Sequence, residues 1–163
     1  MRSDMMKLVI FEIGGDLFAA DVLAVDRVLR YVTPNAVPDV PAWVEGVIEH
    51  RKSVIPVIDL RRRLGFTEHA VGSGTRIVVL NTSAGHVAGI VDAVKEVAVV
   101  PTGAVTAPPP LFRGLSSDAI RGIAKVGERL VVLLDVERVL ATADRVLADR
   151  AATSVGVGDG EAD

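Results

Sequence analysis

Short apolar runs separated by turn residues occupy most of the 163-residue chain. Three pairs of these runs predict β-hairpins: residues 7–13 with 17–21, 76–80 with 86–91, and 120–126 with 130–134. The first pair is joined by Gly14-Gly15-Asp16, and glycine readily adopts the positive φ of a hairpin turn. Such a density of short strands and turns favours a barrel or sandwich architecture.

Several segments between these runs carry weaker signals. Residues 22–32 and 44–48 fit a strand or a helical turn, because periodicity does not decide pieces this short. Residues 53–59 predict a strand at an edge or a bulge, because Pro56 cannot donate to a ladder. A short helix is expected over residues 60–64, with Asp59 as its N-cap.

Further along the chain, residues 93–100 predict a strand that Pro101 ends. Near the end, apolar residues recur at spacings of 3, 4 and 7 from Val136 to Leu147, which predicts an amphipathic helix. We interpret residues 149–163 as a disordered tail, because they are small and acidic with no apolar periodicity.

The composition and charge of the chain exclude several classes of function. Charged residues make up 24% of the chain at a net charge of −3, so there is no basic footprint for nucleic acid and no polybasic surface for a membrane. The chain has no cysteine, which excludes a disulfide framework, a thiolate metal cluster and a cysteine nucleophile. No apolar run approaches the roughly 18 residues of a membrane span. We therefore expect a cytoplasmic protein.

Few residues of the chain are candidates for catalysis or for binding a metal or an anion. We interpret His50, His69 and His86 as solvated or turn histidines, because none has metal-ligand spacing to another. The run Arg61 to Arg63 could hold an anion, but the solvated face of a one-turn helix explains it better. Neither a nucleophile–base pair nor a phosphate loop is readable. We expect no enzymatic activity, no cofactor and no metal.

Four segments of the chain form an ordered set of motifs. The fullest runs from Gly46-Val47-Ile48 through Pro56-Val57-Ile58-Asp59-Leu60-Arg61 to Leu64-Gly65. The other segments are Phe11-Glu12-Ile13-Gly14-Gly15 leading through Val25-Asp26-Arg27-Val28 to Pro38-Asp39-Val40-Pro41, residues 87–97, and Ile120-Arg121-Gly122-Ile123 with Leu133-Leu134-Asp135-Val136. Together they resemble the family of CheW-like chemotaxis coupling proteins, and four matches in the same order are far more specific than a single motif.

This resemblance implies a mainly β fold of two small SH3-like five-stranded β-barrels packed side by side, with a C-terminal helix. We expect residues 6–148 to form this single CheW-like domain. The resemblance also implies a non-catalytic adaptor that binds the regulatory domain of a CheA-type histidine kinase and the cytoplasmic hairpin tip of a chemoreceptor. We expect no direct membrane insertion, and self-association is an open alternative.

The positions that match the family's receptor-facing groove are Val25, Gly46 and Arg51. Arg51 would fork to a carboxylate or carbonyl group of the partner, and Val25 would line the groove. Val25 and Gly46 also have structural explanations. Val25 fits the core equally well, and Gly46 fits a backbone turn.

Three more positions in the candidate site depart from the family pattern. Arg27 stands where the family has Glu, Glu49 where it has Asn, and Lys52 where it has Gly. Between them, His50 replaces a Leu of the family pattern. Lys52 would cost about 1 kcal/mol if the positive φ of that glycine is kept. Because Arg27 and Arg51 would repel each other, Arg27 could pair with Glu49 or Glu45; equally, all three side chains could point into solvent.

Two other functions fit the residues. The chain could be a stand-alone CheW-like interaction module that no longer bridges receptor and kinase. It could also be a small ligand-binding or anion-binding β-barrel that uses the cluster from Arg61 to Arg63.

Overall fold

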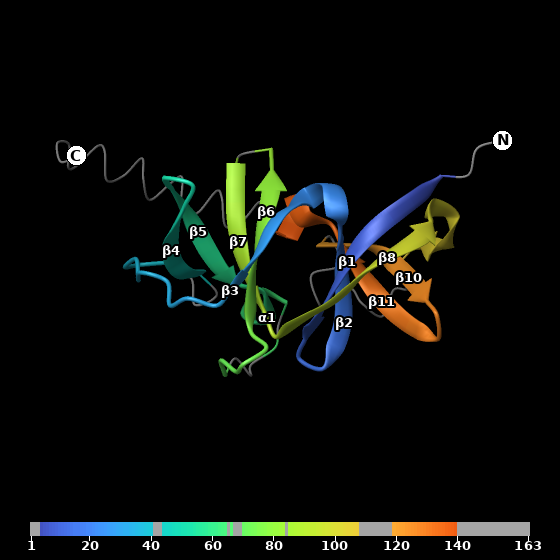
Figure 1. The fold of residues 1–163 in the computed structure, drawn as a ribbon, viewed down its shortest axis with the longest axis horizontal. Helices are drawn as coiled ribbons and strands as arrows, with labels where there is room; N and C mark the ends of the chain where they lie inside the picture. Colours follow the sequence, from blue (N-terminus) through green and yellow to red (C-terminus); the bar gives the residue numbers. More distant parts are fainter. Residues whose placement is uncertain are drawn as a thin grey trace.

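A computed structural model of the chain shows two small β-barrels lying side by side (Figure 1). The structure describes residues 4–40, 44–64, 66, 70–83, 85–107 and 119–139. One sheet consists of β1 (Met5–Ile13), β2 (Asp16–Asp21), β8 (Ala93–Pro101), β9 (Val105–Thr106), β10 (Ile120–Val126) and β11 (Arg129–Leu134), in the order β8-β1-β2-β11-β10-β9. The other consists of β3 (Val25–Arg30), β4 (Val44–His50), β5 (Ser53–Asp59), β6 (Arg76–Thr82) and β7 (Gly85–Val91), in the order β3-β6-β7-β5-β4.

The predicted mainly β fold with two SH3-like barrels is therefore confirmed, with the two-residue strand β9 added to one sheet. All three predicted hairpins are present as β1–β2, β6–β7 and β10–β11. In the first of them, Gly14 and Gly15 have φ of 61° and 86°, the conformation for which glycine was expected.

The two ambiguous segments are strands because each finds a partner in the five-stranded sheet. β3 pairs with β6, and β4 pairs with β5. Pairing over the whole strand thus outweighs the helical spacing of residues 22–29, of which only Val22–Ala24 forms a short 3₁₀ turn, η1.

The edge position expected for the Pro56 strand is wrong, since β5 lies between β7 and β4. Pro56 is tolerated there because the parallel pairing with β7 begins only at Val57. On the other side, Pro56 lies opposite Val47 of β4, whose N–H and C=O bond to Asn35, so this pair needs no N–H from Pro56.

Each barrel has its own apolar cluster, and a third cluster joins the two. That shared core includes Phe11 and Leu134 from the six-stranded sheet and Ile58 and Val78 from the five-stranded sheet. Each of these four side chains is at most 3% exposed. Burying both sheets against one core fixes how the barrels lie relative to each other.

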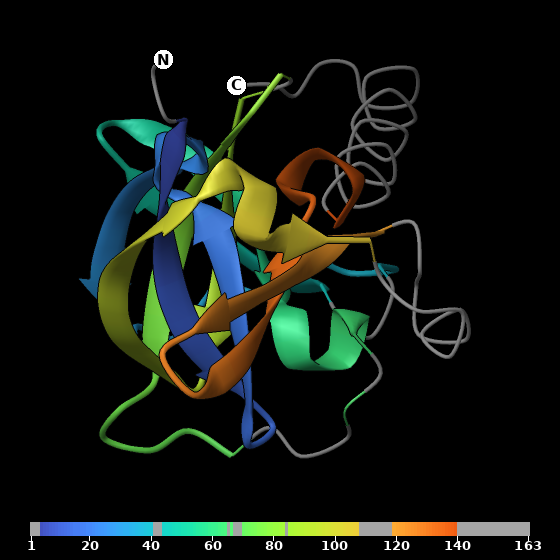
Figure 2. The same cartoon turned by 90° about the vertical axis from the view of Figure 1, so that its right-hand side faces the viewer.

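Helical structure is limited in the described part of the chain. The expected helix after Asp59 is α1 (Leu60–Arg63), which Asp59 caps by accepting a hydrogen bond from the backbone N–H of Arg61 at 3.0 Å. A second 3₁₀ turn, η2 (Thr102–Ala104), follows β8. Figure 2 shows α1 as the green helix at the lower right of the view.

The C-terminal helix begins as expected, with residues 136–139 helical. The rest of that helix and the tail of residues 149–163 lie outside the described residues. No helix of the described segments is long and apolar enough to cross a membrane.

The solvated face expected for the basic run of α1 is wrong for Arg61, which is 2% exposed. Its guanidinium donates to Asp59 Oδ1 at 3.0 Å and to Asp92 Oδ1 at 2.8 Å. Asp92 in turn accepts from the backbone N–H of Gly14, in the turn between β1 and β2. Burial opposes the charge of Arg61, but the hydrogen bonds and charges of the two carboxylates outweigh it and raise the pKa of Arg61. Arg61 is thus a structural tie between the two barrels.

Candidate partner-binding surface

The turn between β4 and β5 is formed by two cationic residues of the candidate site. Arg51 and Lys52 have φ of 52° and 68°, as a two-residue type I′ turn requires. Both residues are exposed, and His50 pairs with Ser53 at the base of the turn. The positive φ at position 52 is therefore kept without glycine, and two positive charges project from the tip.

Gly46 has a structural explanation in the same hairpin. Its φ is 142°, and it follows a break in the β4–β5 register. The backbone of Asn35 lies alongside β4 here, since Asn35 and Val47 form an antiparallel bridge with two hydrogen bonds of 2.9 Å. A Cβ atom on residue 46 would lie 2.0 Å from the Asn35 carbonyl oxygen, so this close approach excludes any side chain at residue 46.

Val25 and Arg27 lie on β3, on either side of a bulge. Val25 is half-buried against the shared core, whereas Arg27 is exposed. The register of β3 with β6 shifts between these two residues, which leaves Asp26 as the extra residue. The Asp26 carboxylate reaches across to the other hairpin, where its Oδ1 lies 3.6 Å from Nη1 of Arg51.

This contact corrects the suggested pairing of Arg27 with Glu49 or Glu45. Glu49 is exposed on β4, and within the described residues no ion pair within 4.0 Å joins Arg27 to either glutamate. The negative charge beside Arg51 comes instead from Asp26, one residue before Arg27. The structure therefore brings β3 and the turn of Arg51 and Lys52 together through a residue outside the predicted set.

His50 is the second residue that the sequence interpretation missed. It was expected to be solvated, but it is 6% exposed, and its Nε2 lies 3.1 Å from Asp26 Oδ2. The ring of His86 packs edge-on against it at a centroid distance of 5.7 Å. His86 is half-buried, and His69 lies outside the described residues. A signal was available in the sequence, because His50 occupies the position where the family pattern has an apolar Leu.

Electrostatics in this cluster favour an ionised Asp26. The hydrogen bond with His50 lowers the pKa of Asp26 most strongly, partial burial opposes it, and the charge of Arg51 adds to the lowering. Asp26 is 18% exposed, so solvent reaches it only from one side.

Two exposed apolar side chains flank this charged cluster. Leu23 in η1 is 83% exposed and Val28 on β3 is 40% exposed. They come just before and just after Val25 and Arg27 in the chain. Exposed apolar side chains beside fixed charges are what a protein partner needs for affinity and for orientation.

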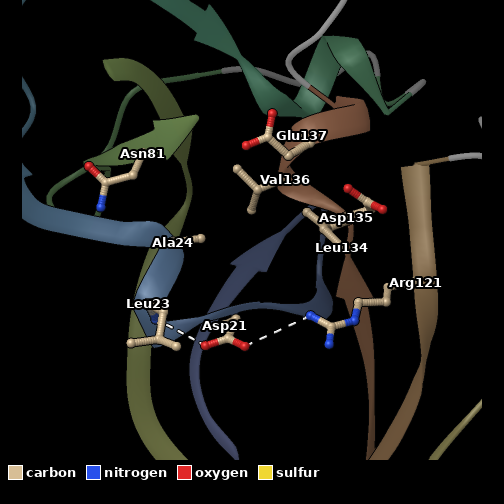
Figure 3. A pocket seen from close by; sticks show the side chains of 9 residues that line it. All are labelled: Asp21, Leu23, Ala24, Asn81, Arg121, Leu134, Asp135, Val136 and Glu137. Atoms are coloured by element: carbon tan, nitrogen blue, oxygen red, sulfur yellow. Dashed lines mark hydrogen bonds and ion pairs between the residues drawn. The ribbon is translucent and has the colours of Figure 1, made fainter. Parts of the chain in front are cut away.

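A pocket of about 370 Å³ lies between the barrels and is lined by residues of η1 and of both sheets (Figure 3). Its carboxylates already have partners within the chain. Asp21 accepts from the backbone N–H of Leu23 at 3.0 Å, and its Oδ2 lies 3.8 Å from Arg121 Nη1. Glu137 accepts from both the backbone N–H and the hydroxyl of Ser83, and Asp135 accepts from the backbone N–H of Arg138. These structural contacts give no support to a catalytic site among the residues drawn around the pocket.

Metal chemistry is equally unsupported in the part of the chain that the structure describes. No group of three or more His, Cys, Asp or Glu residues there is arranged to hold a metal ion. The arrangement of exposed cations, fixed charges and apolar neighbours suits protein recognition.

Comparison with known proteins identifies the family. The model of the CheW-like domain matches residues 7–144. The chain belongs to the CheW family. The CheW fold is also seen in the crystal structure of the scaffolding protein TtCheW from Thermoanaerobacter tengcongensis, with a TM-score of 0.79, 28% sequence identity, and coverage of 84% of this chain and 93% of that chain.

Curated relatives agree. The chemotaxis protein CheW of Treponema pallidum is 26% identical over 87% of this chain and 86% of its own length. CheW of Bacillus subtilis is 31% identical over 82% and 86%, and Protein FrzA of Myxococcus xanthus is 32% identical over 72% and 74%. The CheW family is one of chemotaxis coupling adaptors, and its members are scaffolds without catalytic activity.

Proposed function

We propose that this CheW-family chain is a non-catalytic cytoplasmic adaptor that couples a chemoreceptor to a CheA-type histidine kinase. The observation that carries the proposal is the anchored cationic turn. Arg51 and Lys52 project from the β4–β5 hairpin, and Asp26 ties that hairpin to β3. The receptor-facing surface would comprise Val25, Arg27, Gly46, Glu49, Arg51 and Lys52.

The six residues have different roles on this surface. Arg27, Glu49, Arg51 and Lys52 are exposed and supply charges that set the register of a partner. Gly46 keeps the hairpin in place through its contact with the Asn35 backbone. Val25 supports β3 from the core side, while its neighbours Leu23 and Val28 offer the apolar area.

The other two candidate functions have less support. An anion-binding barrel would need the basic run of α1, but Arg61 is buried and already bound to Asp59 and Asp92. A stand-alone interaction module differs from the coupling adaptor only in its partners, so a binding experiment separates them.

The test is co-sedimentation of the purified protein with a CheA-type kinase and membranes that carry a chemoreceptor. Arg51→Ala is expected to weaken recruitment to receptor membranes about tenfold, the effect of losing a central arginine anchor. Arg129→Ala is the matched control, because Arg129 is also exposed and ion-paired, with Glu96, but lies on β11 of the other barrel.

Each outcome has a clear meaning. Recruitment to both partners, sensitive to Arg51→Ala and not to Arg129→Ala, supports the proposal. Binding to the kinase with no receptor binding would favour the stand-alone module. Absence of binding to either partner would refute the coupling function.

A further inference from the structure

Asp26, His50 and His86 meet where the two edges of the five-stranded sheet come together. Asp26 lies on the edge strand β3 and His50 on the opposite edge strand β4, and His86 lies on β7 between them. The only described hydrogen bond of the Asp26 side chain is with His50, at 3.1 Å. This bond therefore links the two edges of the barrel.

A buried imidazole in this position lowers the stability of the fold unless it makes a hydrogen bond. His50 is 6% exposed, and burying a polar group without a hydrogen bond is strongly unfavourable. Asp26 satisfies it with a carboxylate, which makes a much stronger bond to an imidazolium than to a neutral ring. The link between β3 and β4 is thus sensitive to the proton on the ring.

The same carboxylate also holds Arg51. Asp26 Oδ2 contacts His50, while its Oδ1 faces Arg51 Nη1 at 3.6 Å. When the imidazole is neutral, the full charge of Asp26 attracts Arg51. When the imidazole carries a proton, its charge neutralises Asp26, and Arg51 then faces a second cation.

His86 adds a second imidazole to the cluster. Its ring lies 5.7 Å from that of His50, so two imidazolium groups would repel each other. The charged and titratable groups that face His50 are Asp26 from β3, His86 from β7 and Arg51 from the adjoining turn. Histidine is the residue type whose ordinary charge change lies between pH 5 and 8, so pH 5.5 and pH 8.0 are the two conditions that test the cluster.

We propose that Asp26, His50 and His86 form a proton-sensitive latch that closes the five-stranded barrel and sets how firmly Arg51 is held. At higher pH Arg51 is drawn back to Asp26. At lower pH the link between β3 and β4 tightens and Arg51 is released toward a partner. The latch itself is a property of the free protein, and its effect on binding rests on the proposed function.

The first test uses the free protein. Thermal unfolding of the wild type, Asp26→Asn, His50→Leu and the double variant forms a cycle that isolates the Asp26–His50 interaction. The coupling is expected to be present at pH 8.0 and about twice as large at pH 5.5, because the bond between the Asp26 carboxylate and a neutral imidazole becomes an ion pair with an imidazolium. An equal coupling at the two pH values would overturn the latch.

His50→Gln keeps the test decisive if His50→Leu does not fold. Glutamine retains an N–H donor toward Asp26 but does not titrate between these pH values. The latch predicts that the loss of Tm caused by Asp26→Asn depends on pH more strongly in the wild type than in the His50→Gln background, where only the charge of His86 still acts on Asp26. An equal pH dependence in the two backgrounds would refute the role of His50.

The second test measures the receptor contact. Arg51→Ala is expected to weaken recruitment to receptor membranes roughly two- to fivefold more at pH 5.5 than at pH 8.0, the range of one exposed ion pair. In His50→Gln the loss is expected to be equal at the two pH values. If receptor binding is absent at every pH while the coupling in the free protein follows pH, the proposed function fails and the latch stands. If the loss caused by Arg51→Ala does not change with pH in the wild type, the release of Arg51 is wrong.

Discussion

At the scale of single residues, the turn of Arg51 and Lys52 stores strain. Lys52 keeps φ at 68°, a conformation that is costly for a residue with a Cβ atom and free for glycine. We expect Lys52→Gly to raise the free energy of unfolding by about 1 kcal/mol, measured by urea denaturation.

Lys52→Ala is the matched variant, because it removes the same charge and keeps the Cβ atom. It should leave stability nearly unchanged. Equal stabilisation by alanine and glycine would trace the effect to the lost charge instead of the backbone. The natural choice of lysine at a strained position would agree with a role for its charge in recognition.

Asp26 gives the protein an acid-sensitive contact. The hydrogen bond with His50 lowers the pKa of Asp26 below its ordinary value of 3.8, so folding favours the ionised form. The stability that this carboxylate contributes is complete above pH 3.8 and is lost as the pH falls through the lower value in the folded state. We expect the difference in Tm between the wild type and Asp26→Asn to shrink as the pH falls below 3.8. A difference that grows on acidification below pH 4 would contradict this sign.

The residues that sequence reasoning missed share one property. His50 bonds to Asp26, and Arg61 bonds to Asp92, and in each pair the two residues are distant in the sequence. No local sequence pattern predicts a partner of this kind, so a solvated histidine and a solvated arginine were the reasonable expectations. Asp59, whose capping bond is local, was predicted correctly.

At the scale of secondary-structure elements, hairpins were easier to predict than lone strands. The β1–β2, β6–β7 and β10–β11 pairs carry both their apolar runs and their turn residues within a few positions. β3 could not be assigned, because its partner β6 follows only after β4 and β5. The β4–β5 hairpin is local but was missed, because its two turn residues, Arg51 and Lys52, are not the Asn and Gly residues typical of such a turn. A distant partner also misplaced β5, whose parallel neighbour β7 lies beyond α1 and β6.

The β4–β5 hairpin depends on the close approach of the Asn35 backbone to Gly46. We expect Gly46→Ala to lower the free energy of unfolding by about 2–4 kcal/mol, because the added Cβ would lie 2.0 Å from the Asn35 carbonyl oxygen and φ is 142°. Chemical denaturation measures the loss.

Gly85 supplies the control for this prediction. Its φ of 124° is similarly unfavourable for alanine, but a Cβ atom there would meet nothing within 4 Å. Gly85→Ala therefore reports backbone strain alone and should cost less. Equal losses for the two variants would mean that the contact with Asn35 contributes nothing.

At the scale of the whole molecule, Arg61 ties the two barrels through buried charges. Arg61→Met removes the guanidinium that lies 3.0 Å from Asp59 and leaves this carboxylate, which is 1% exposed, only with Arg62, whose Nε lies 4.0 Å away. Breaking a buried ion pair from one side typically costs about 3–5 kcal/mol, and we expect a loss of stability in that range by denaturant unfolding.

The double variant Asp59→Asn with Arg61→Met should recover part of that loss, because the buried charge of Asp59 is removed together with its cation, and Asp92, which also loses Arg61, is 29% exposed. Without such recovery, packing of the arginine side chain, and not its charge, would be the main contribution. Asp92 keeps its bond to the Gly14 N–H in both variants, so the β1–β2 turn should be unaffected.

The two barrels are also nested along the chain. All five strands of one barrel lie between Val25 and Val91, while the other uses β1 and β2 before them and β8 to β11 after them. Its closing parallel pair joins Phe18, near the beginning, to Val132. On a ribosome, the inner barrel can therefore be finished while the outer one is still a partial sheet whose apolar face, including Leu8 and Ile10, lacks its cover. In pulsed hydrogen exchange on refolding chains, the amides of β6 and β7 should become protected before those of β2. A newly made chain would need its last strands, or a chaperone, to cover that apolar face and keep it from other chains.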